Sequence, residues 1–265
     1  MDQRELAEVR RSQQEAARGT HRGSDQNEIQ RYLAPASNTP FPLEYAFVVL
    51  GDLSGKTVVD LGCGSGKNLI PLIQRGAQVI GIDLSPELIE LARARLAEAA
   101  LHADLCIASA YETNLPKGVA DVVLCAAILH HLELGRAKQE IFRILRPGGL
   151  LVIKEPTRFS PVLNHLRRIL PSRDDISEYE HPLTEVELLE FVQGFDVTAD
   201  RAFRLPFIAL VQRLSKTLGR GRAWLTLDAW LIRTFPVLRR VATVRVMALT
   251  PQKTQVILAL LPGVY

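Results

Sequence analysis

The sequence predicts an α/β domain in which a mostly parallel sheet carries helices on both faces. Apolar β-branched runs alternate with segments of helical spacing, and the connections have the length of strand–helix–strand units. The composition, 47% hydrophobic and 23% charged, is that of an ordinary globular protein. A chain of 265 residues exceeds the usual single-domain range of roughly 100 to 200 residues, although α/β domains of about 250 are common. We therefore expect one domain with an elaboration.

The expected elements follow in order along the chain. Strands are expected at 57–62, 77–84, 103–110, 121–127, 150–156 and 195–203, and a final one at 252–261. Helices are expected at 67–76, 85–99, 136–145 and 184–192, and a turn at 146–149. Two helix starts are marked clearly: Ser85 precedes Pro86, and Thr184 precedes Glu187 by three residues, as in a capping box.

These elements suggest four parts. Residues 1–44 form an N-terminal arm or lid, because the first 30 are mostly polar and are interrupted by Gly19 and Gly23. Residues 45–203 form the core, 204–251 a basic helical insertion, and 252–265 the last strand of the core.

The cysteines and the apolar runs exclude several classes of protein. Cys63, Cys106 and Cys125 lie in apolar surroundings that fit neither a disulfide framework nor a zinc site. The charged N-terminal stretch lacks the apolar core of a signal peptide, and no run approaches the roughly 18 apolar residues of a membrane span. The sequence therefore predicts a cytoplasmic protein.

A glycine loop follows the first expected strand. Gly62, Gly64 and Gly66 stand where glycine permits a positive φ and close approach of the backbone to a ligand. A dinucleotide fingerprint would need glycine at the position of Lys67, which disfavours a nicotinamide cofactor. Asp83, at the end of the second strand, can accept hydrogen bonds from both hydroxyls of a ribose. Together the two signals favour a nucleoside-bearing ligand over a simple tight turn.

Five ordered segments resemble the motifs of the class I S-adenosylmethionine-dependent methyltransferases, in particular the small-molecule enzymes with a VLDLGCGxG signature. They are VVDLGCGSG (58–66), VIGIDLSPELI (79–89), ASAYETNLP (108–116), DVVLCAAILHHL (121–132) and LRPGGLLVIKEP (145–156). The resemblance covers residues 45–203 and the final strand. It implies a Rossmann-like, doubly wound sheet of seven strands with an antiparallel last strand, and S-adenosyl-L-methionine as the cofactor.

The resemblance also implies a set of cofactor-binding residues. Asp60 would lie near the ammonium group, Asp83 would hold the ribose, and Leu84 would pack on the adenine. The whole implied set is Asp60, Gly62, Cys63, Gly64, Gly66, Asp83, Leu84, Ser109, Ala110 and Cys125. The family usually has Asp where this chain has Ser109, which implies a weaker or water-mediated contact to the adenine amino group.

Methyl transfer needs alignment of the acceptor, and it needs a base only when the acceptor must lose a proton. His130 and His131 follow the fourth strand, at the sheet edge where ligands bind in open α/β folds. Adjacent side chains point in different directions, so one of the pair is expected to face the cofactor, with His130 favoured as the base. The alternative is that both only cap the strand end through hydrogen bonds.

Four further side chains are pocket candidates, each with a structural alternative. Glu155 can orient a substrate or form a surface salt bridge, and His181 can line the pocket or lie in a solvated turn. Tyr32 and Tyr45 can cover the cofactor or fill the core. No metal site is expected, because the adjacent histidines lack the spacing and the framing carboxylates or cysteines of one.

A basic segment separates the last two expected strands. Between Arg201 and Arg245 there are ten Lys or Arg residues against one acid, Asp228, a net charge of +9 in a chain whose total is +3. Two runs at helical spacing, 207–218 and 224–235, carry apolar faces beside these charges. This pattern is typical of a lid over an apolar substrate, a membrane-surface helix or a dimer interface, expected in that order. The apolar content argues against nucleic acid.

The sequence therefore predicts a methyltransferase that acts on an oxygen or nitrogen of a small apolar molecule, such as a secondary metabolite or a lipid-like intermediate. Its expected partners are that acceptor, with peripheral membrane contact or a homodimer as further possibilities. A non-catalytic S-adenosylmethionine-binding protein that holds a partner through the insertion is the main alternative.

Overall fold

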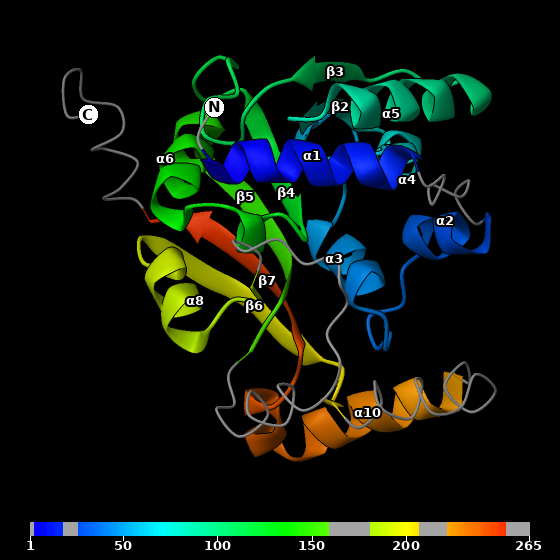
Figure 1. Cartoon of the computed structure of the whole chain (residues 1–265). Coiled ribbons are helices and arrows are strands. Elements are labelled where there is room, and N and C mark those ends of the chain that lie inside the picture. The colour runs from blue at the N-terminus through cyan, green and yellow to red at the C-terminus, as the bar shows by residue number, and fades with distance from the viewer. Residues whose placement is uncertain (1–2, 18–25, 159–180, 207–221, 253–265) are drawn as a thin grey trace.

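The computed structural model describes residues 3–17, 26–158, 181–206 and 222–252 (Figure 1). These residues form one seven-stranded sheet in the order β3-β2-β1-β4-β5-β7-β6. The strands are β1 (Thr57–Leu61), β2 (Gln78–Asp83), β3 (Asp104–Ile107), β4 (Ala120–Ala126), β5 (Leu145–Pro156), β6 (Phe195–Phe203) and β7 (Val244–Pro251). The α-helices are α1 (Gln3–Ala17), α2 (Gln26–Leu33), α3 (Pro42–Leu50), α4 (Leu69–Gln74), α5 (Pro86–Glu98), α6 (Leu134–Ile144), α8 (Glu185–Val192) and α10 (Arg222–Thr234). Two 3-10 helices are η1 (Leu129–His131) and η2 (Pro236–Arg240).

The strand pairing confirms the predicted topology. The pairs β3-β2, β2-β1, β1-β4 and β4-β5 are parallel, whereas β7 runs antiparallel to both β5 and β6. The chain winds from β1 outward to β2 and β3 and then returns to the other side of β1 as β4. This switch opens a crevice at the carboxyl ends of β1 and β4, where open α/β sheets bind ligands.

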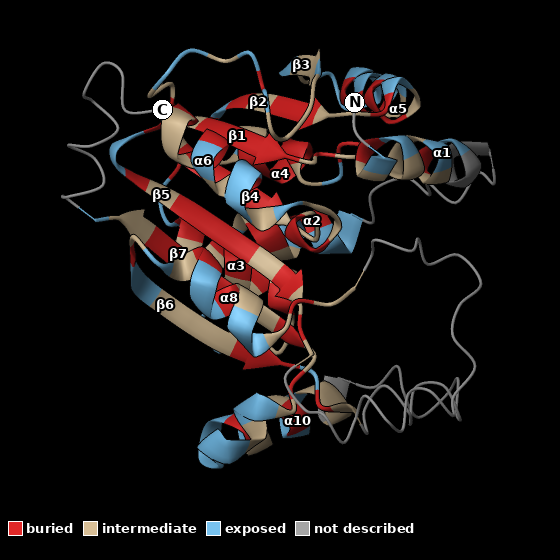
Figure 2. Cartoon of the chain, turned by 60° about the vertical axis from the view of Figure 1, so that its left-hand side comes forward, coloured by how far each residue is buried: buried red, intermediate tan, exposed pale blue. Residues whose placement is uncertain are grey.

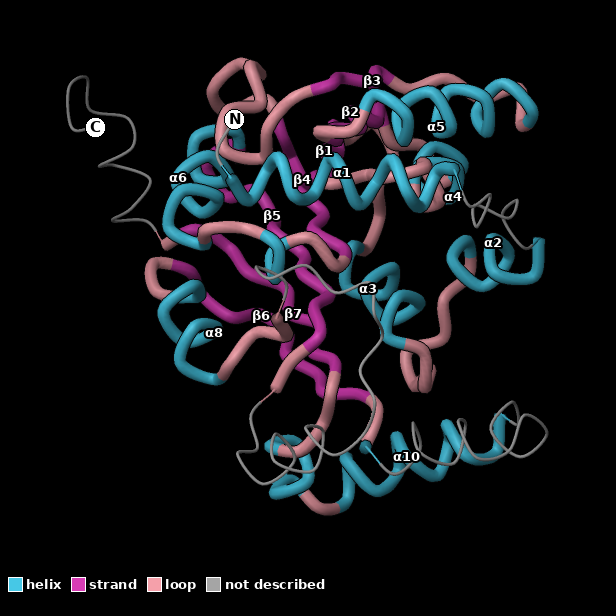
Figure 3. Tube along the Cα trace, in the orientation of Figure 1, coloured by secondary structure: helices cyan, strands magenta, loops and turns pink. Residues whose placement is uncertain are grey.

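Helices cover both faces of the sheet (Figure 3). Alternate residues of β1 explain the layers, because Val58 packs with α2, α3, α4 and α5 on one face and Val59 packs with α6 and α8 on the other. Both valines are fully buried, as are most residues of the central strands (Figure 2). Burial on both faces is what a parallel sheet requires.

The marked helix starts behave as the sequence predicts. The Ser85 hydroxyl accepts a hydrogen bond from the backbone N–H of Leu88 at the start of α5. Thr184 and Glu187 form the complete capping box of α8. The turn expected at 146–149, by contrast, lies within β5, which begins at Leu145 and pairs irregularly with β4 near Ala120.

The N-terminal arm is a correction to the sequence reading. Residues 3–17 form the helix α1, and 26–33 form α2; Gly19 and Gly23 lie outside the described residues. The polar composition and the two glycines predict a frayed or lid-like arm rather than a helix of 15 residues. The helix packs on the domain through polar side chains: Glu5 is 8% exposed and Ser12 is 6% exposed.

The place of the last strand is a second correction. The seventh strand is Val244–Pro251, which falls within the predicted insertion, whereas most of the predicted strand, 253–261, lies outside the described residues. Because it contains Arg245, this stretch was counted with the basic segment. Its guanidinium pairs with Asp200 on the neighbouring strand β6, so the charge is neutralised within the sheet. The insertion therefore ends before Val244, and of its two expected helices the structure describes the second, α10.

Gly66 offers a test of the packing beneath the glycine loop. A Cβ at this position would lie 2.8 Å from the Cβ of Ala92 in α5, and its φ is +78°. We expect Gly66→Ala to lower the free energy of unfolding by about 1 to 3 kcal/mol, because the added methyl group would have to displace α5 or strain the backbone of the loop. Thermal unfolding of the cofactor-free protein measures the loss. Gly64→Ala is the matched control, since its φ is also positive but no atom lies within 4 Å of its Cβ position; equal losses in both variants would contradict the packing argument.

Candidate functional site

A cleft of about 200 Å³ lies at the carboxyl ends of β1, β2 and β4. Its walls include the loop glycines Gly62 and Gly64, Asp83 with Leu84 after β2, and the turn after β3. The members of the predicted cofactor set that line it are Gly62, Gly64, Asp83, Leu84, Ser109 and Ala110. The fold thus brings together residues that are far apart in the sequence.

Asp83 holds the floor of this cleft in place. Its Oδ2 accepts a hydrogen bond from the Gly64 N–H at 2.8 Å, and its Oδ1 accepts one from the Ser85 N–H at 3.0 Å. Burial raises the pKa of its carboxyl group, while these backbone hydrogen bonds oppose the rise. One carboxylate therefore joins the glycine loop to the start of α5.

Asp60 lies beneath the glycine loop with its charge uncompensated. It is fully buried, and neither carboxylate oxygen has a hydrogen-bond partner among the described residues. Burial raises its pKa to about 7; the nearby Asn68 side chain opposes the rise, and the charge of Asp83 adds to it. An orphaned buried carboxylate is costly unless a cation approaches it. The site therefore fits a ligand that carries an ammonium group.

Four members of the predicted cofactor set lie away from the cleft wall. Asp60 lies beneath the loop, Gly66 packs against α5, and Cys63 and Cys125 are buried in the core. Burial raises the pKa of both cysteine thiols. They are thus core side chains that support the loop and β4.

Helix α1 lies over the cleft, a position that agrees with the lid alternative expected for the N-terminal arm. Five of its side chains line the cavity: Arg4, Glu5, Glu8, Arg11 and Ser12. The Ser109 hydroxyl donates a hydrogen bond to Glu5, and Gln13 reaches Glu87 on α5 at 3.0 Å. Figure 1 shows α1 lying across the strand ends. The polar residues of the helix are the only sequence signal, and they read as solvent-exposed until the cleft beneath them is known.

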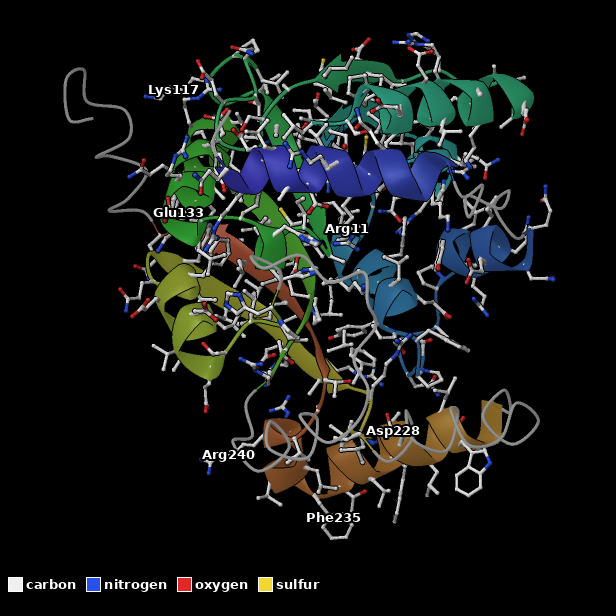
Figure 4. The ribbon with its side chains drawn as sticks, in the orientation of Figure 1. Arg11, Lys117, Glu133, Asp228, Phe235 and Arg240 are labelled. Atoms are coloured by element: carbon white, nitrogen blue, oxygen red, sulfur yellow. The ribbon has the colours of Figure 1, made fainter. Side chains whose placement is uncertain are left out.

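His131 joins α1 to the end of β4. Its Nδ1 lies 3.2 Å from Glu8 Oε2, and its Nε2 lies 3.5 Å from Arg11, which Figure 4 labels. Burial acts to raise the pKa of Glu8, but the hydrogen bond and charge of His131 outweigh it and lower the pKa. His131 thus faces the cofactor cleft and ties the covering helix to it.

His130 is held by a fully buried carboxylate. Glu155 Oε1 accepts hydrogen bonds from the N–H groups of Ile128 and Leu129, both at 2.9 Å, and its Oε2 lies 2.8 Å from His130 Nδ1. The surface salt bridge considered for Glu155 is therefore wrong, because this side chain is 0% exposed. A carboxylate at Nδ1 favours the tautomer with its proton there and leaves Nε2 as an acceptor.

The two histidine rings lie side by side, but only His131 lines the cofactor cleft, so one member of the pair faces it as expected, and that member is not the favoured His130. Their centroids are 4.0 Å apart, with the planes tilted by 40°. The turn that produces this begins at Ala127, which has a φ of +65° and donates its N–H to the Lys154 carbonyl. The following 3-10 helix, η1, then presents both rings at the same edge. Alternation of side chains, which holds for a strand, does not hold for this turn.

A second cleft of about 390 Å³ adjoins the first. Arg4 and Leu132 line both cavities, and His130 and His181 line the second. His181 Nε2 lies 2.8 Å from Glu187, so His181 is tied to the start of α8. The remaining lining side chains come mainly from α6 and α8: Leu129, Glu133, Leu134, Gly135, Lys138, Leu183, Glu187, Glu190 and Phe191.

The two tyrosines proposed as a cover lie elsewhere. Tyr32 is 8% exposed and stacks on Phe47, with ring centroids 4.8 Å apart. Tyr45 packs against Phe203 and under the guanidinium of Arg201. Both belong to the packing around α3, and α1 takes the covering position.

The described residues contain no group of three or more His, Cys, Asp or Glu side chains that could hold a metal ion. No helix among them is long and apolar enough to cross a membrane.

The fold and the cleft are those of a nucleoside-cofactor-binding α/β protein: a glycine loop, an acid at the end of β2, and a buried carboxylate beneath the loop. Comparison with known proteins identifies the family. Residues 59–153 match the model of a methyltransferase domain. An uncharacterized methyltransferase of Mycobacterium bovis is 31% identical over 184 residues, which are 64% of this chain and 73% of the relative. The chain belongs to the class I S-adenosylmethionine-dependent methyltransferases, and S-adenosyl-L-methionine is its methyl donor.

Two other proteins are also similar to this chain. A ubiquinone biosynthesis O-methyltransferase of Xanthomonas oryzae is 33% identical over 141 residues, which are 50% of this chain and 59% of the relative. The crystal structure of a geranyl diphosphate C-methyltransferase from Streptomyces coelicolor, with S-adenosyl-L-homocysteine bound, has a TM-score of 0.56 and 15% identity, and covers 84% of this chain and 87% of its own. The latter similarity concerns the fold alone.

Asp83 provides a direct test of the cofactor cleft. We expect Asp83→Ala to weaken S-adenosylmethionine binding by about 1 to 3 kcal/mol, because charge-assisted hydrogen bonds to the ribose are lost. Isothermal calorimetry measures the change. Asp104→Ala, in an exposed position on β3, controls for the loss of one negative charge, and unchanged affinity in Asp83→Ala would remove Asp83 from the site.

Proposed function

We propose that this methyltransferase transfers the methyl group to an oxygen or nitrogen of a small, largely apolar acceptor, with His130 as the general base and Glu155 as its positioning residue. The observation that carries the proposal is the buried Glu155–His130 pair, whose Nδ1–Oε2 distance is 2.8 Å. S-adenosylmethionine supplies an activated methyl group, so the protein needs chiefly to align the acceptor and, for a hydroxyl, to remove its proton.

The second cleft is the proposed acceptor site. It adjoins the cofactor cleft through Arg4 and Leu132, and His130 stands in its wall. Its apolar lining, which includes Leu134, Leu183 and Phe191, suits an apolar acceptor. An acceptor hydroxyl placed against His130 Nε2 would pass its proton to the imidazole, while Glu155 stabilises the resulting imidazolium.

Two of the three glutamates that line this cleft, Glu133 and Glu187, are already engaged. The two carboxylate oxygens of Glu133 accept from the N–H groups of Gly135 and Arg136, and those of Glu187 contact His181 and Thr184. They are therefore poorly placed to act as competing bases. His130 differs from these residues, because the buried Glu155 holds its Nδ1 and thereby fixes the role of its second ring nitrogen, Nε2.

The relatives favour an oxygen acceptor. The O-methyltransferase of ubiquinone biosynthesis is named for that reaction, and hydroxyl acceptors are the ones that benefit from a base. We also propose that α1 acts as the cover of the active site. Its contacts with Ser109 and His131 lie over the cofactor cleft and would exclude water during transfer.

The test is a transfer assay with methyl-labelled S-adenosylmethionine and matched acceptors that share one apolar skeleton and carry a phenol, an alcohol, an amine or no nucleophile. We expect label in the phenol or alcohol, with His130→Ala as the inactive control. Label found only on carbon, or undiminished in the His130 variant, would contradict the proposal.

A further inference from the structure

Helix α10 and the following η2 extend beyond the carboxyl end of β6 (Figure 1). One side of this unit is anchored to the core. The buried Asp228 carboxylate accepts hydrogen bonds from the N–H groups of Arg204 at 3.0 Å and Leu205 at 2.8 Å. Ile232 packs in a small cluster with Ala202 and neighbouring apolar residues. The orientation of α10 is therefore fixed, and its outer side is defined.

That outer side carries an aromatic patch, which we define as Leu227, Trp230, Phe235 and Val237. These side chains are 40%, 48%, 49% and 69% exposed. The rings of Trp230 and Phe235 meet edge to face, with centroids 6.3 Å apart. Figure 4 shows Phe235 pointing away from the protein while Asp228 points toward it. The patch is thus continuous and apolar, and it is supported by a rigid helix.

Three arginines of α10 and η2 lie within a few residues of the aromatic patch in the chain. Arg233, Arg239 and Arg240 are exposed, and Arg239 uses one hydrogen bond to hold the Asp200 carbonyl. Asp228 is the only acid in the sequence between Arg222 and Val241, and it is buried. The local field is therefore positive, and it favours an anionic surface.

We propose that the aromatic patch docks this protein on an anionic lipid surface. Exposed Trp and Phe side chains beside arginines are suited to the boundary between headgroups and acyl chains. Arginines at the same level attract anionic headgroups. With 13 residues, α10 lies in the interface rather than crossing it. This inference concerns binding alone and does not rest on the acceptor chemistry proposed above.

The structure corrects the face expected from the sequence. The sequence predicts one apolar face with Trp224, Leu227, Leu231 and Phe235 at helical spacing, but Leu231 packs against the cluster around Ile232. Trp230, which lies off that predicted face, is exposed beside Phe235. A test directed at Leu231 would disturb the anchor, whereas one directed at Trp230 and Phe235 leaves it intact.

The chain offers an intrinsic probe of this docking. It has two tryptophans, Trp224 and Trp230, and both lie in α10. We expect vesicles with about 30% phosphatidylglycerol in phosphatidylcholine to shift the fluorescence of the full-length protein to the blue. Pure phosphatidylcholine should produce a much smaller shift. When the variants are compared at equal vesicle binding, the blue shift should persist in Trp224→Phe, which keeps Trp230. It should be lost in Trp230→Phe.

Flotation with the same vesicles measures the affinity. We expect Trp230→Ser combined with Phe235→Ser to weaken binding by more than about tenfold, because two apolar side chains no longer enter the interface. Arg233→Gln with Arg240→Gln should weaken it by about fivefold for each charge at low salt, and raised salt should weaken the wild type in the same direction.

The matched control is Val186→Ser with Leu189→Ser on α8. These side chains are 64% and 60% exposed, but they stand beside Glu185 and Glu190. The control should bind vesicles like the wild type, and all variants should keep the wild-type affinity for S-adenosylmethionine as evidence of folding.

Three results would overturn the proposal. One is equal vesicle binding by the aromatic-patch variant and the α8 control. Another is binding that does not depend on anionic lipid. The third is a dimer in light scattering that the aromatic-patch substitutions convert to a monomer without any vesicle binding, since the patch would then be an interface between copies of this chain.

Discussion

Replacement of Glu155 by glutamine is expected to lower turnover by roughly 10²- to 10⁴-fold, although the side chain makes no contact with solvent. The N–H groups of Ile128 and Leu129 require an acceptor, so the amide oxygen takes the place of Oε1. The amide nitrogen then faces His130 Nδ1 and donates to it. This moves the imidazole proton to Nε2, the atom that must accept the proton of the substrate. His130→Ala should lose about 10²-fold or more.

Single-turnover kinetics with a hydroxyl acceptor measures both losses. The control is S-adenosylmethionine affinity, which should stay within about threefold in both variants, because neither side chain lines the cofactor cleft. The ascending limb of kcat against pH, which reports deprotonation of the base, should disappear in His130→Ala. Losses below about fivefold would show that positioning of the acceptor alone suffices. A larger loss in His131→Ala than in His130→Ala would show that His131, and not His130, is the base.

Replacement of Asp60 by asparagine is expected to have opposite effects on cofactor binding and on the stability of the cofactor-free protein. The buried carboxyl group has a pKa of about 7 in the fold, against about 4 in an unfolded chain. Its protonated form therefore stabilises the fold at low pH, and this contribution is lost as the pH rises through about 7. Asparagine removes the buried charge, so Asp60→Asn should unfold at a higher temperature than the wild type at pH 8 and show little difference at pH 4.5.

Cofactor binding should respond to pH in the reverse direction. The ammonium group of S-adenosylmethionine favours the ionised carboxylate, so the wild-type affinity should fall by up to about tenfold for each pH unit below 7. Asp60→Asn should bind at least about tenfold more weakly at pH 8 and retain little of this pH dependence. Calorimetry between pH 5.5 and 8 measures both, and the asparagine variant also corrects for titration of the cofactor itself. An unchanged pH dependence in Asp60→Asn would separate Asp60 from the ammonium group.

The sequence alone was sufficient for the central sheet and the cofactor-binding segments. Parallel strands buried on both faces appear as apolar runs, and Ser85 and Thr184 mark helix starts through contacts within four residues. The glycine loop and Asp83 are also local signals, because each belongs to a strand end whose position the alternation of elements determines. Their joint appearance indicated a nucleoside-bearing cofactor before any geometry was known.

Contacts between distant segments decided the rest of the site. Glu155 reads as a surface residue beside Lys154, and only the packing of β5 against η1 places it on His130, 25 residues away in the chain. The polar segment of α1 predicts only an arm or lid, and its contacts could not be predicted because its partners Ser109 and His131 lie more than 100 residues later.

The same physical reason explains the last strand and the aromatic patch. Arg245 reads as surface charge until its pairing with Asp200 on β6 is known. Helical spacing identifies α10 as amphipathic, but it does not tell which apolar residues meet the core, and the anchor formed by Asp228 and Ile232 makes that choice. Local propensity and burial pattern are properties of short segments. The pairing of charges and the covering of a cleft are properties of the assembled fold, and the sequence carries them only through its tertiary contacts.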